Sequence, residues 1–171
     1  MVSSSIQGIL VVLILLFSTS MAFSETAREI DVSVDATLDR FNKEILGADG
    51  FIKKAKGVLI FPQVIKVGFG IGGEYGEGAL RIGGKTVEYY STMAASIGFQ
   101  FGAQAKSIIL VFTKDDASKA FRKNDGWKAG VDGSVALISL SMGDSLDTIN
   151  VKDPIVAFVF GQKGLMYNLT L

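Results

Sequence analysis

Two segments of the chain alternate large apolar residues with glycine or small polar residues, and this pattern restricts the fold most. The first runs from Val67 to Gly72 and alternates Val67, Phe69 and Ile71 with Gly68, Gly70 and Gly72. The second runs from Ser96 to Gly102 and places Ile97, Phe99 and Phe101 between Ser96, Gly98, Gln100 and Gly102. Because successive side chains of a strand point to opposite faces of a sheet, each segment predicts a strand with one nearly bare face.

Glycine inside a strand weakens packing and usually indicates tight curvature or the close approach of another element or a ligand. The pattern therefore favours a bent, barrel-like antiparallel sheet with a helix seated on the glycine face. A cleft that accepts an acyl chain or a lipid head group is the alternative.

The segment before these strands has the spacing of an amphipathic helix. Apolar residues recur at intervals of four, four, three and four, at Ile30, Val34, Leu38, Phe41 and Ile45. At about 100° per residue these side chains share one arc of a helix. Acidic residues outnumber basic ones on the polar positions, whereas helices that lie on membranes usually carry Lys and Arg there. We expect this helix to pack on the domain's own sheet, with membrane insertion as the alternative.

The remaining elements are shorter. Helices are expected at Phe51–Ala55 and Asp115–Lys123, and Gly83-Gly84 is a hairpin turn between Ala79–Ile82 and Lys85–Tyr90. Pro62 is expected to end a strand because it cannot donate a ladder hydrogen bond. The further strands expected are Val58–Phe61, Ile108–Phe112, Val135–Leu140, Ile155–Gly161 and Leu165–Leu171. The sequence thus predicts one α+β domain with a curved barrel-like antiparallel sheet, an N-terminal amphipathic helix and short additional helices.

Residues 1–24 contain no charged side chain and include the apolar run Ile9 to Phe17, which is too short to cross a bilayer of roughly 30 Å unaided. Ala22 and Ser24 occupy the −3 and −1 positions of a cleavage site before Glu25. This pattern predicts a signal peptide at 1–24 and a mature domain at 25–171, exported to the periplasm or held peripherally at a membrane. An uncleaved N-terminal anchor is the alternative.

Charge and composition exclude several functions. Lys and Arg number 17, as do Asp and Glu, and a nucleic-acid partner ordinarily demands a basic excess. The chain has no His and no Cys, which removes Ser–His–Asp triads, thiolate nucleophiles and Cys–His metal sites. The carboxylates lack the spacing of a calcium loop. We therefore expect neither catalysis, nor a metal, nor a cofactor.

Basic residues next to aromatic ones suggest a membrane-facing surface. Every charged residue between Asp49 and Glu74 is a lysine, and a second basic segment surrounds Trp127. Lysine pairs with anionic head groups, while Trp and Phe suit the boundary between polar and apolar phases. The candidate lipid-binding residues are Phe51, Lys53, Lys54, Lys56, Lys66, Trp127 and Lys128. A solvated face whose aromatic rings lie in the core is the alternative.

Several motifs resemble those of the SYLF domain, a lipid-binding domain of bacteria and eukaryotes that is called an actin-binding domain in yeast relatives. The resemblance covers nearly the whole of residues 28–171. It is carried by Ala55 to Gly78, Gly83 to Val87, Ala94 to Lys106, Gly126 to Ser134 and Lys163 to Leu169.

The resemblance implies a non-enzymatic domain that binds phosphoinositides in eukaryotic relatives and actin in some of them. For an exported bacterial chain, actin is not an expected partner, and an anionic phospholipid surface takes the place of phosphoinositides. The alternative is a structural or protein-interaction module that binds a partner in the cell envelope without binding lipid.

Overall fold

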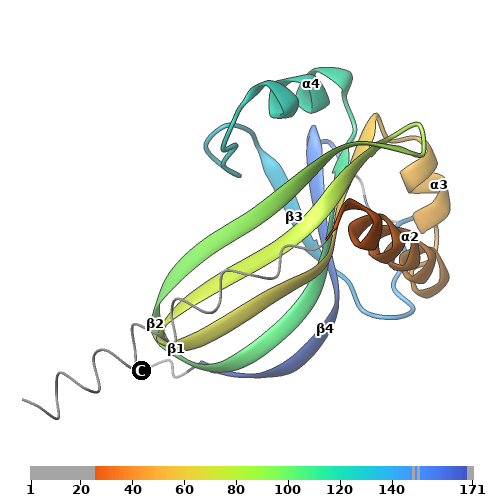
Figure 1. Ribbon diagram of the computed structural model, residues 1–171. Coiled ribbons are helices and arrows are strands. Elements are labelled where there is room, and N and C mark those ends of the chain that lie inside the picture. The colour runs from red at the N-terminus through yellow and green to blue at the C-terminus, as the bar shows by residue number, and fades with distance from the viewer. Residues whose placement is uncertain (1–25, 148, 150, 169–171) are drawn as a thin grey trace, which may run out of the picture.

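The computed structural model describes residues 26–147, 149 and 151–168, without the side chains of 97–100 and 166–168. The proposed signal peptide lies outside these residues. The elements, shown in Figure 1, are α2 (Ala27–Glu44), α3 (Ala48–Lys53), β1 (Gly57–Ile82), β2 (Lys85–Phe112), α4 (Asp115–Lys123), β3 (Val135–Ser139) and β4 (Ile155–Asn168).

The four strands form one curved sheet in the order β1-β2-β4-β3. Antiparallel pairing joins β1 to β2 and β2 to β4, whereas β3 lies parallel to β4. The α+β prediction is confirmed. The expectation of a wholly antiparallel sheet is wrong at β3, because the connection from Leu140 to Pro154 returns the chain to the same end of the sheet before β4 begins. No backbone pairing joins the edge strands β1 and β3 along their described lengths, so the sheet is open.

The separately predicted strands of the first two thirds merge into one long ribbon. β1 and β2 pair from Gly57↔Phe112 to Ile82↔Lys85, and the expected turn at Gly83-Gly84 joins them. Both turn glycines have positive φ, at 59° and 78°. Pro62 does not end a strand: the pairing shifts register between Phe61 and Val64, and a proline in such a bulge needs no ladder partner.

The ribbon bends at Gly70 and folds back on itself. Gly70 has a φ of 74°, and the register jumps there from Phe69↔Phe101 to Ile71↔Ile97. Beyond the bend, glycines of β1 lie against its first half. A Cβ on Gly76 would lie 2.8 Å from the carbonyl oxygen of Gln63, and one on Gly78 would collide with the backbone of Ile60. The pairs Gly76–Gln63 and Gly78–Ile60 lie symmetrically on either side of the bend. The two halves of β1 therefore pack against each other in antiparallel directions.

This approach corrects the expected role of the glycines. A Cβ on Gly70 would meet nothing within 4 Å, so no helix covers the bend. The close neighbour of Gly76 and Gly78 is the first half of β1, and a Cβ on Gly72 would lie 2.8 Å from the Ser96 hydroxyl of β2 and 3.1 Å from the Val67 carbonyl oxygen. Gly98 lies among the residues whose side chains are not described.

α2 covers one face of the sheet, as its periodicity predicted. Its residues Ile30, Val34 and Phe41 are buried against Ile109 of β2 and Phe158 of β4. Phe41 packs its ring 4.9 Å from that of Phe160 and 5.7 Å from that of Phe158. The helix begins with a capping box in which the Thr26 side chain accepts from the Glu29 N–H and the Glu29 carboxylate accepts from the Thr26 N–H.

A second apolar cluster fills the other side of the sheet. It joins Leu59 and Phe61 of the first half of β1 to Leu80 of its second half. Phe121 of α4 closes the cluster, with its ring 5.1 Å from that of Phe112. The folded-back ribbon and α4 therefore take the place of a helical layer on this face.

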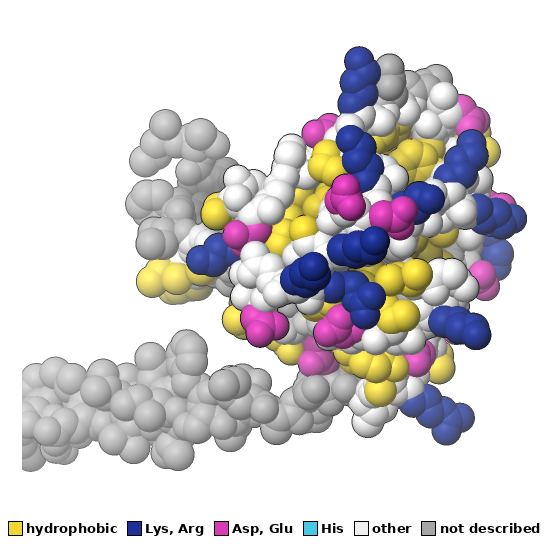
Figure 2. Space-filling view, turned by 90° about the horizontal axis from the view of Figure 1, so that it is seen from above, with side chains coloured by type: hydrophobic (Ala, Val, Ile, Leu, Met, Phe, Trp, Pro, Cys, Tyr) yellow, Lys and Arg dark blue, Asp and Glu magenta, His cyan; other side chains and the backbone are white. Residues whose placement is uncertain are grey.

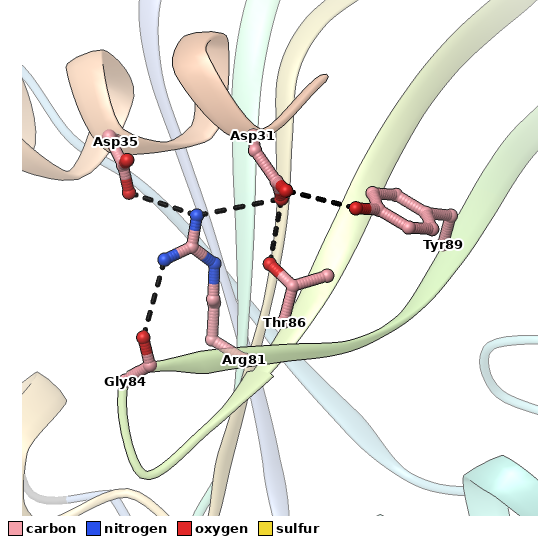
Figure 3. A network of polar contacts seen from close by, with 6 residues as sticks. All are labelled: Asp31, Asp35, Arg81, Gly84, Thr86 and Tyr89. Atoms are coloured by element: carbon pink, nitrogen blue, oxygen red, sulfur yellow. Dashed lines mark hydrogen bonds and ion pairs between the residues drawn. The ribbon is translucent and has the colours of Figure 1, made fainter. Parts of the chain in front are cut away.

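Polar contacts tie the start of α2 to the turn end of the ribbon (Figure 3). The Asp31 carboxylate accepts hydrogen bonds from Thr86 at 2.7 Å and Tyr89 at 2.9 Å. Arg81 lies 2.9 Å from Asp35 and 3.6 Å from Asp31, and it also donates to the carbonyl of Gly84. These contacts fix the helix relative to the ribbon.

We expect Gly78→Ala to lower the free energy of unfolding by roughly 1–3 kcal/mol, because the added methyl group meets the backbone of Ile60, which cannot move aside alone. Gly73→Ala is the matched control: its methyl group would lie 3.7 Å from the nearest atom, the Ala94 carbonyl oxygen. This control should be neutral or stabilising by up to about 1 kcal/mol. Urea denaturation of both variants measures the difference, and equal stabilities would contradict the fold-back contact.

The Asp31 contacts predict a pH dependence. The hydrogen bond from Thr86, together with that from Tyr89 and the charge of Arg81, lowers the pKa of Asp31 below its ordinary value of 3.8. The stabilisation of the folded state by these contacts is therefore complete above the ordinary pKa of 3.8, and it disappears as the pH falls through the lower pKa that Asp31 has in the folded state. Asp31→Asn should have a lower Tm than the wild type near neutral pH. In thermal melts from about pH 7 to pH 2, the difference in Tm between the two proteins should disappear towards the lowest pH. A Tm difference that does not depend on pH would contradict this role of Asp31.

Candidate functional site

The folded-back end of the ribbon exposes large apolar side chains. We define the ribbon tip as residues 65–75 of β1, 93–106 of β2 and 162–165 of β4. Its most exposed apolar side chains are Phe69 at 83%, Met93 at 78%, Ile71 at 73% and Leu165 at 70%. Ile65, Val67, Tyr75 and Phe101 are also exposed. The tip lies at the end of the curved strands remote from α4 (Figure 1).

Strand pairing brings these side chains onto one continuous surface. Val67 pairs with Ala103, which pairs with Leu165 on β4. Phe69 pairs with Phe101, and their rings meet edge to face at 5.1 Å. Beyond the bend, Tyr75 pairs with Met93. A contiguous apolar surface of this kind is uncommon on a soluble monomer and usually indicates a contact with a partner or a membrane.

The inner face of the same segment carries charges. Lys106 Nζ lies 2.9 Å and 3.1 Å from the two carboxylate oxygens of Glu74, and Lys66 Nζ lies 3.9 Å from Glu74. The three side chains are about one fifth exposed. Glu74 belongs to the second half of β1 and Lys66 to the first, so this cluster links the two halves. The tip therefore has the Lys66–Glu74–Lys106 cluster inside and its large apolar residues outside, the reverse of the sheet beneath α2.

The charge of the tip is positive. Its charged residues are Lys66, Lys106 and Lys163 against Glu74, a net charge of +2. Lys163 is exposed, and its pairing with Ala105 places it on the same face as Ile65. The outward-facing surface thus combines apolar side chains with a lysine at its edge.

The two aromatic residues predicted to bind lipid lie in the apolar clusters. The Phe51 ring packs edge to face on Phe158 at 5.4 Å. The Trp127 ring lies 5.3 Å from that of Phe121, and a Cβ on Gly133 would lie 2.9 Å from it. These rings fit the alternative in which the aromatic residues belong to the core, and they do not combine with the basic residues into an exposed patch.

The predicted lysines divide into two groups. Lys53, Lys54 and Lys56 are exposed at the end of α3; Lys53 pairs with Asp49 at 2.6 Å, and Lys56 lies 3.9 Å from Asp115 of α4. Lys128 is exposed in the loop after α4. Lys66 belongs to the ribbon tip. The structure therefore does not unite the predicted set into one site, and a role in lipid binding stays a prediction for each lysine.

The most exposed residues of the tip were missed as site residues. Phe69 and Ile71 were assigned only to a strand face, and Met93 and Leu165 were not singled out. One signal in the sequence pointed to Phe69 and Ile71. Their neighbours along the strand, which face the other side of the sheet, are glycines, and the nearest charged residues, Lys66 and Glu74, lie on that same glycine face. A face of this composition cannot form a dry core.

Neither a metal site nor a transmembrane helix is found in the described part of the chain. No group of three or more Asp and Glu side chains comes together there to hold a metal ion, and none of its helices is long and apolar enough to span a bilayer.

A comparison with protein families finds a match over residues 93–171 to the family described as "Ysc84: Las17-binding protein actin regulator". This match confirms the resemblance to the SYLF domain over residues 93–171, and the motifs at 55–78 and 83–87 lie outside the matched range. The matched range contains most of β2 together with α4, β3 and β4. A search among curated proteins gives no match to the chain.

The packing of Trp127 predicts a spectroscopic result. Trp127 is the single tryptophan, and its ring is held between Phe121 and Gly133. Its emission maximum should therefore stay unchanged when phosphatidylglycerol vesicles are added. A control protein with Trp127→Phe and Phe69→Trp reports on the ribbon tip instead. A blue shift of the wild-type emission on vesicle addition would show that the Trp127 segment enters the bilayer.

Proposed function

Since residues 93–171 match the model of the Ysc84 (SYLF) family, we propose that this protein is a non-enzymatic domain that binds anionic phospholipid membranes by inserting its ribbon tip. The observation that carries this proposal is the reversed polarity of the tip, where Phe69 and Ile71 point outward and the Lys66–Glu74–Lys106 cluster points inward. An apolar outer surface is stable when its surroundings are apolar as well.

The energies suit a peripheral interaction. Full burial of a side chain such as Phe, Leu, Ile or Met contributes about 1.5–3 kcal/mol. Phe69, Ile71, Met93 and Leu165 together therefore offer roughly 6–12 kcal/mol, and association costs offset several kcal/mol of it. The net charge of +2 adds attraction to an anionic surface, since each basic residue near such a surface contributes about 1 kcal/mol.

The proposal includes export. The uncharged first 24 residues predict a signal peptide, and α2 is capped from Thr26 onward, so cleavage before Glu25 would leave this cap intact. The family description names Las17 and actin. An exported domain is not expected to meet actin, and lipid is therefore the ligand proposed for this chain.

We expect the double variant Phe69→Ser, Ile71→Ser to bind phosphatidylglycerol vesicles at least about 100-fold more weakly than the wild type, because it removes roughly 3–6 kcal/mol of apolar burial. Co-sedimentation with vesicles at low and high salt measures the effect. Leu137→Ser is the matched control, because Leu137 is 70% exposed on β3 outside the ribbon tip. This variant should bind as the wild type does.

Two outcomes would contradict the proposal. In one, the folded double variant binds vesicles as tightly as the wild type. In the other, the wild type is a dimer by analytical ultracentrifugation and the double variant a monomer, while lipid binding is equal in both. That second result would assign the tip to contact between two copies of this chain. Circular dichroism and melting curves verify that the substitutions leave the fold intact.

A further inference from the structure

We propose that the domain bridges two anionic bilayers, with the ribbon tip in one bilayer and a basic surface at its opposite end against the other. This inference rests on the proposed function of the ribbon tip. It assigns a separate role to the lysines that do not belong to the tip.

The basic end consists of three segments, 48–56, 81–88 and 113–134. The first contains α3, the second the ribbon turn and the third α4 with its following loop. Two ion pairs connect them: Lys56 lies 3.9 Å from Asp115, and Arg122 lies 3.6 Å from Glu88. Figure 1 places α4 and α3 away from the tip, and Figure 2, seen from above, shows Lys and Arg side chains spread over this end.

This end carries a net charge of +4. It has ten basic residues and six acidic ones. The basic residues are Lys53, Lys54, Lys56, Arg81, Lys85, Lys114, Lys119, Arg122, Lys123 and Lys128, and all but Arg81 are exposed. The acidic residues are Asp49, Glu88, Asp115, Asp116, Asp125 and Asp132. An exposed excess of lysine suits electrostatic contact with anionic head groups.

An acidic flank consists of α2 and segment 141–153. α2 has three basic and five acidic residues, and segment 141–153 has one basic and three acidic residues, so each carries a net charge of −2. These two parts lie side by side. The Leu46 N–H donates to the Asp144 carbonyl and the Leu146 N–H to the Leu46 carbonyl, while the Gly143 N–H donates to the Glu44 carbonyl. The net positive charge therefore belongs to the tip and to the basic end, and the acidic flank adjoins the basic end through the pairs of Arg81 with Asp31 and Asp35.

When the ribbon stands upright on a membrane with its tip inserted, the two ends do not contact the same bilayer. Twelve residues of β1 separate Gly57, beside the basic end, from Phe69 at the tip. At about 3.3 Å per residue this is a contour of roughly 40 Å, which curvature shortens. The Debye length is only about 8 Å at physiological ionic strength. When the tip is inserted, the lysines of the basic end lie beyond the field of that bilayer and are free to contact another.

The test is vesicle clustering, measured by dynamic light scattering of phosphatidylglycerol vesicles with added protein. We expect the wild type to cluster the vesicles. The variant Lys53→Gln, Lys54→Gln, Lys56→Gln should bind vesicles through its tip but need roughly a hundredfold more protein for clustering, as three lost lysine contacts imply. The control variant Lys43→Gln, Lys152→Gln removes two lysines from the acidic flank and should cluster vesicles as the wild type does.

The outcomes separate this inference from the proposed function. If the wild type co-sediments with vesicles that stay dispersed, the bridging inference is wrong and tip insertion stands. Equal clustering by the wild type and the Lys53, Lys54, Lys56 variant also overturns it, because contact between membrane-bound copies would then join the vesicles. If the double variant at Phe69 and Ile71 binds vesicles as the wild type does, the proposed function fails first. High salt should disperse the clusters while vesicles still bind protein.

Discussion

The backbone contact between the two halves of β1 is the interaction on which the rest of the structure depends. Gly76 and Gly78 let the second half lie against Gln63 and Ile60 of the first. This contact brings Leu80 over Leu59 and so creates the apolar cluster that α4 completes. It also places Glu74 opposite Lys66. A side chain at these glycines would hold the two halves apart and remove the cluster, the ion pairs and the shape of the tip together.

The ribbon therefore contains two surfaces of opposite character. Near its turn, apolar residues point inward and α2 is held by Asp31 and Arg81. Near its bend, apolar residues point outward around a charged interior. The arrangement near the turn, with apolar side chains facing the core, is common in globular domains. Near the bend, glycines and the Lys66–Glu74–Lys106 cluster occupy the interior in place of large apolar side chains, so the apolar side chains there are exposed.

Much of the fold could be predicted from the sequence, because local patterns determine it. The α2 stripe, the Gly83-Gly84 turn and the helix Asp115–Lys123 depend on residues close in sequence, and the structure confirms them. The fold-back and the parallel β3 depend on contacts between distant residues, which periodicity does not reveal. The candidate site was missed for a related reason: alternation identifies the two faces of a strand, and only the fold-back decides which face points outward. Phe51 and Trp127 show the converse, since basic neighbours in sequence did not make their rings exposed.

The position of α2 in the chain has a consequence for the order of folding. This helix precedes every strand of the sheet in the chain, yet its buried side chains Ile30, Val34 and Phe41 share one cluster with Ile109, Val156 and Phe158. The last two come from β4, at the far end of the chain. Until β4 has joined the sheet, the apolar stripe of α2 has no complete surface to cover it, so the first and last elements of the domain must meet before its core can close.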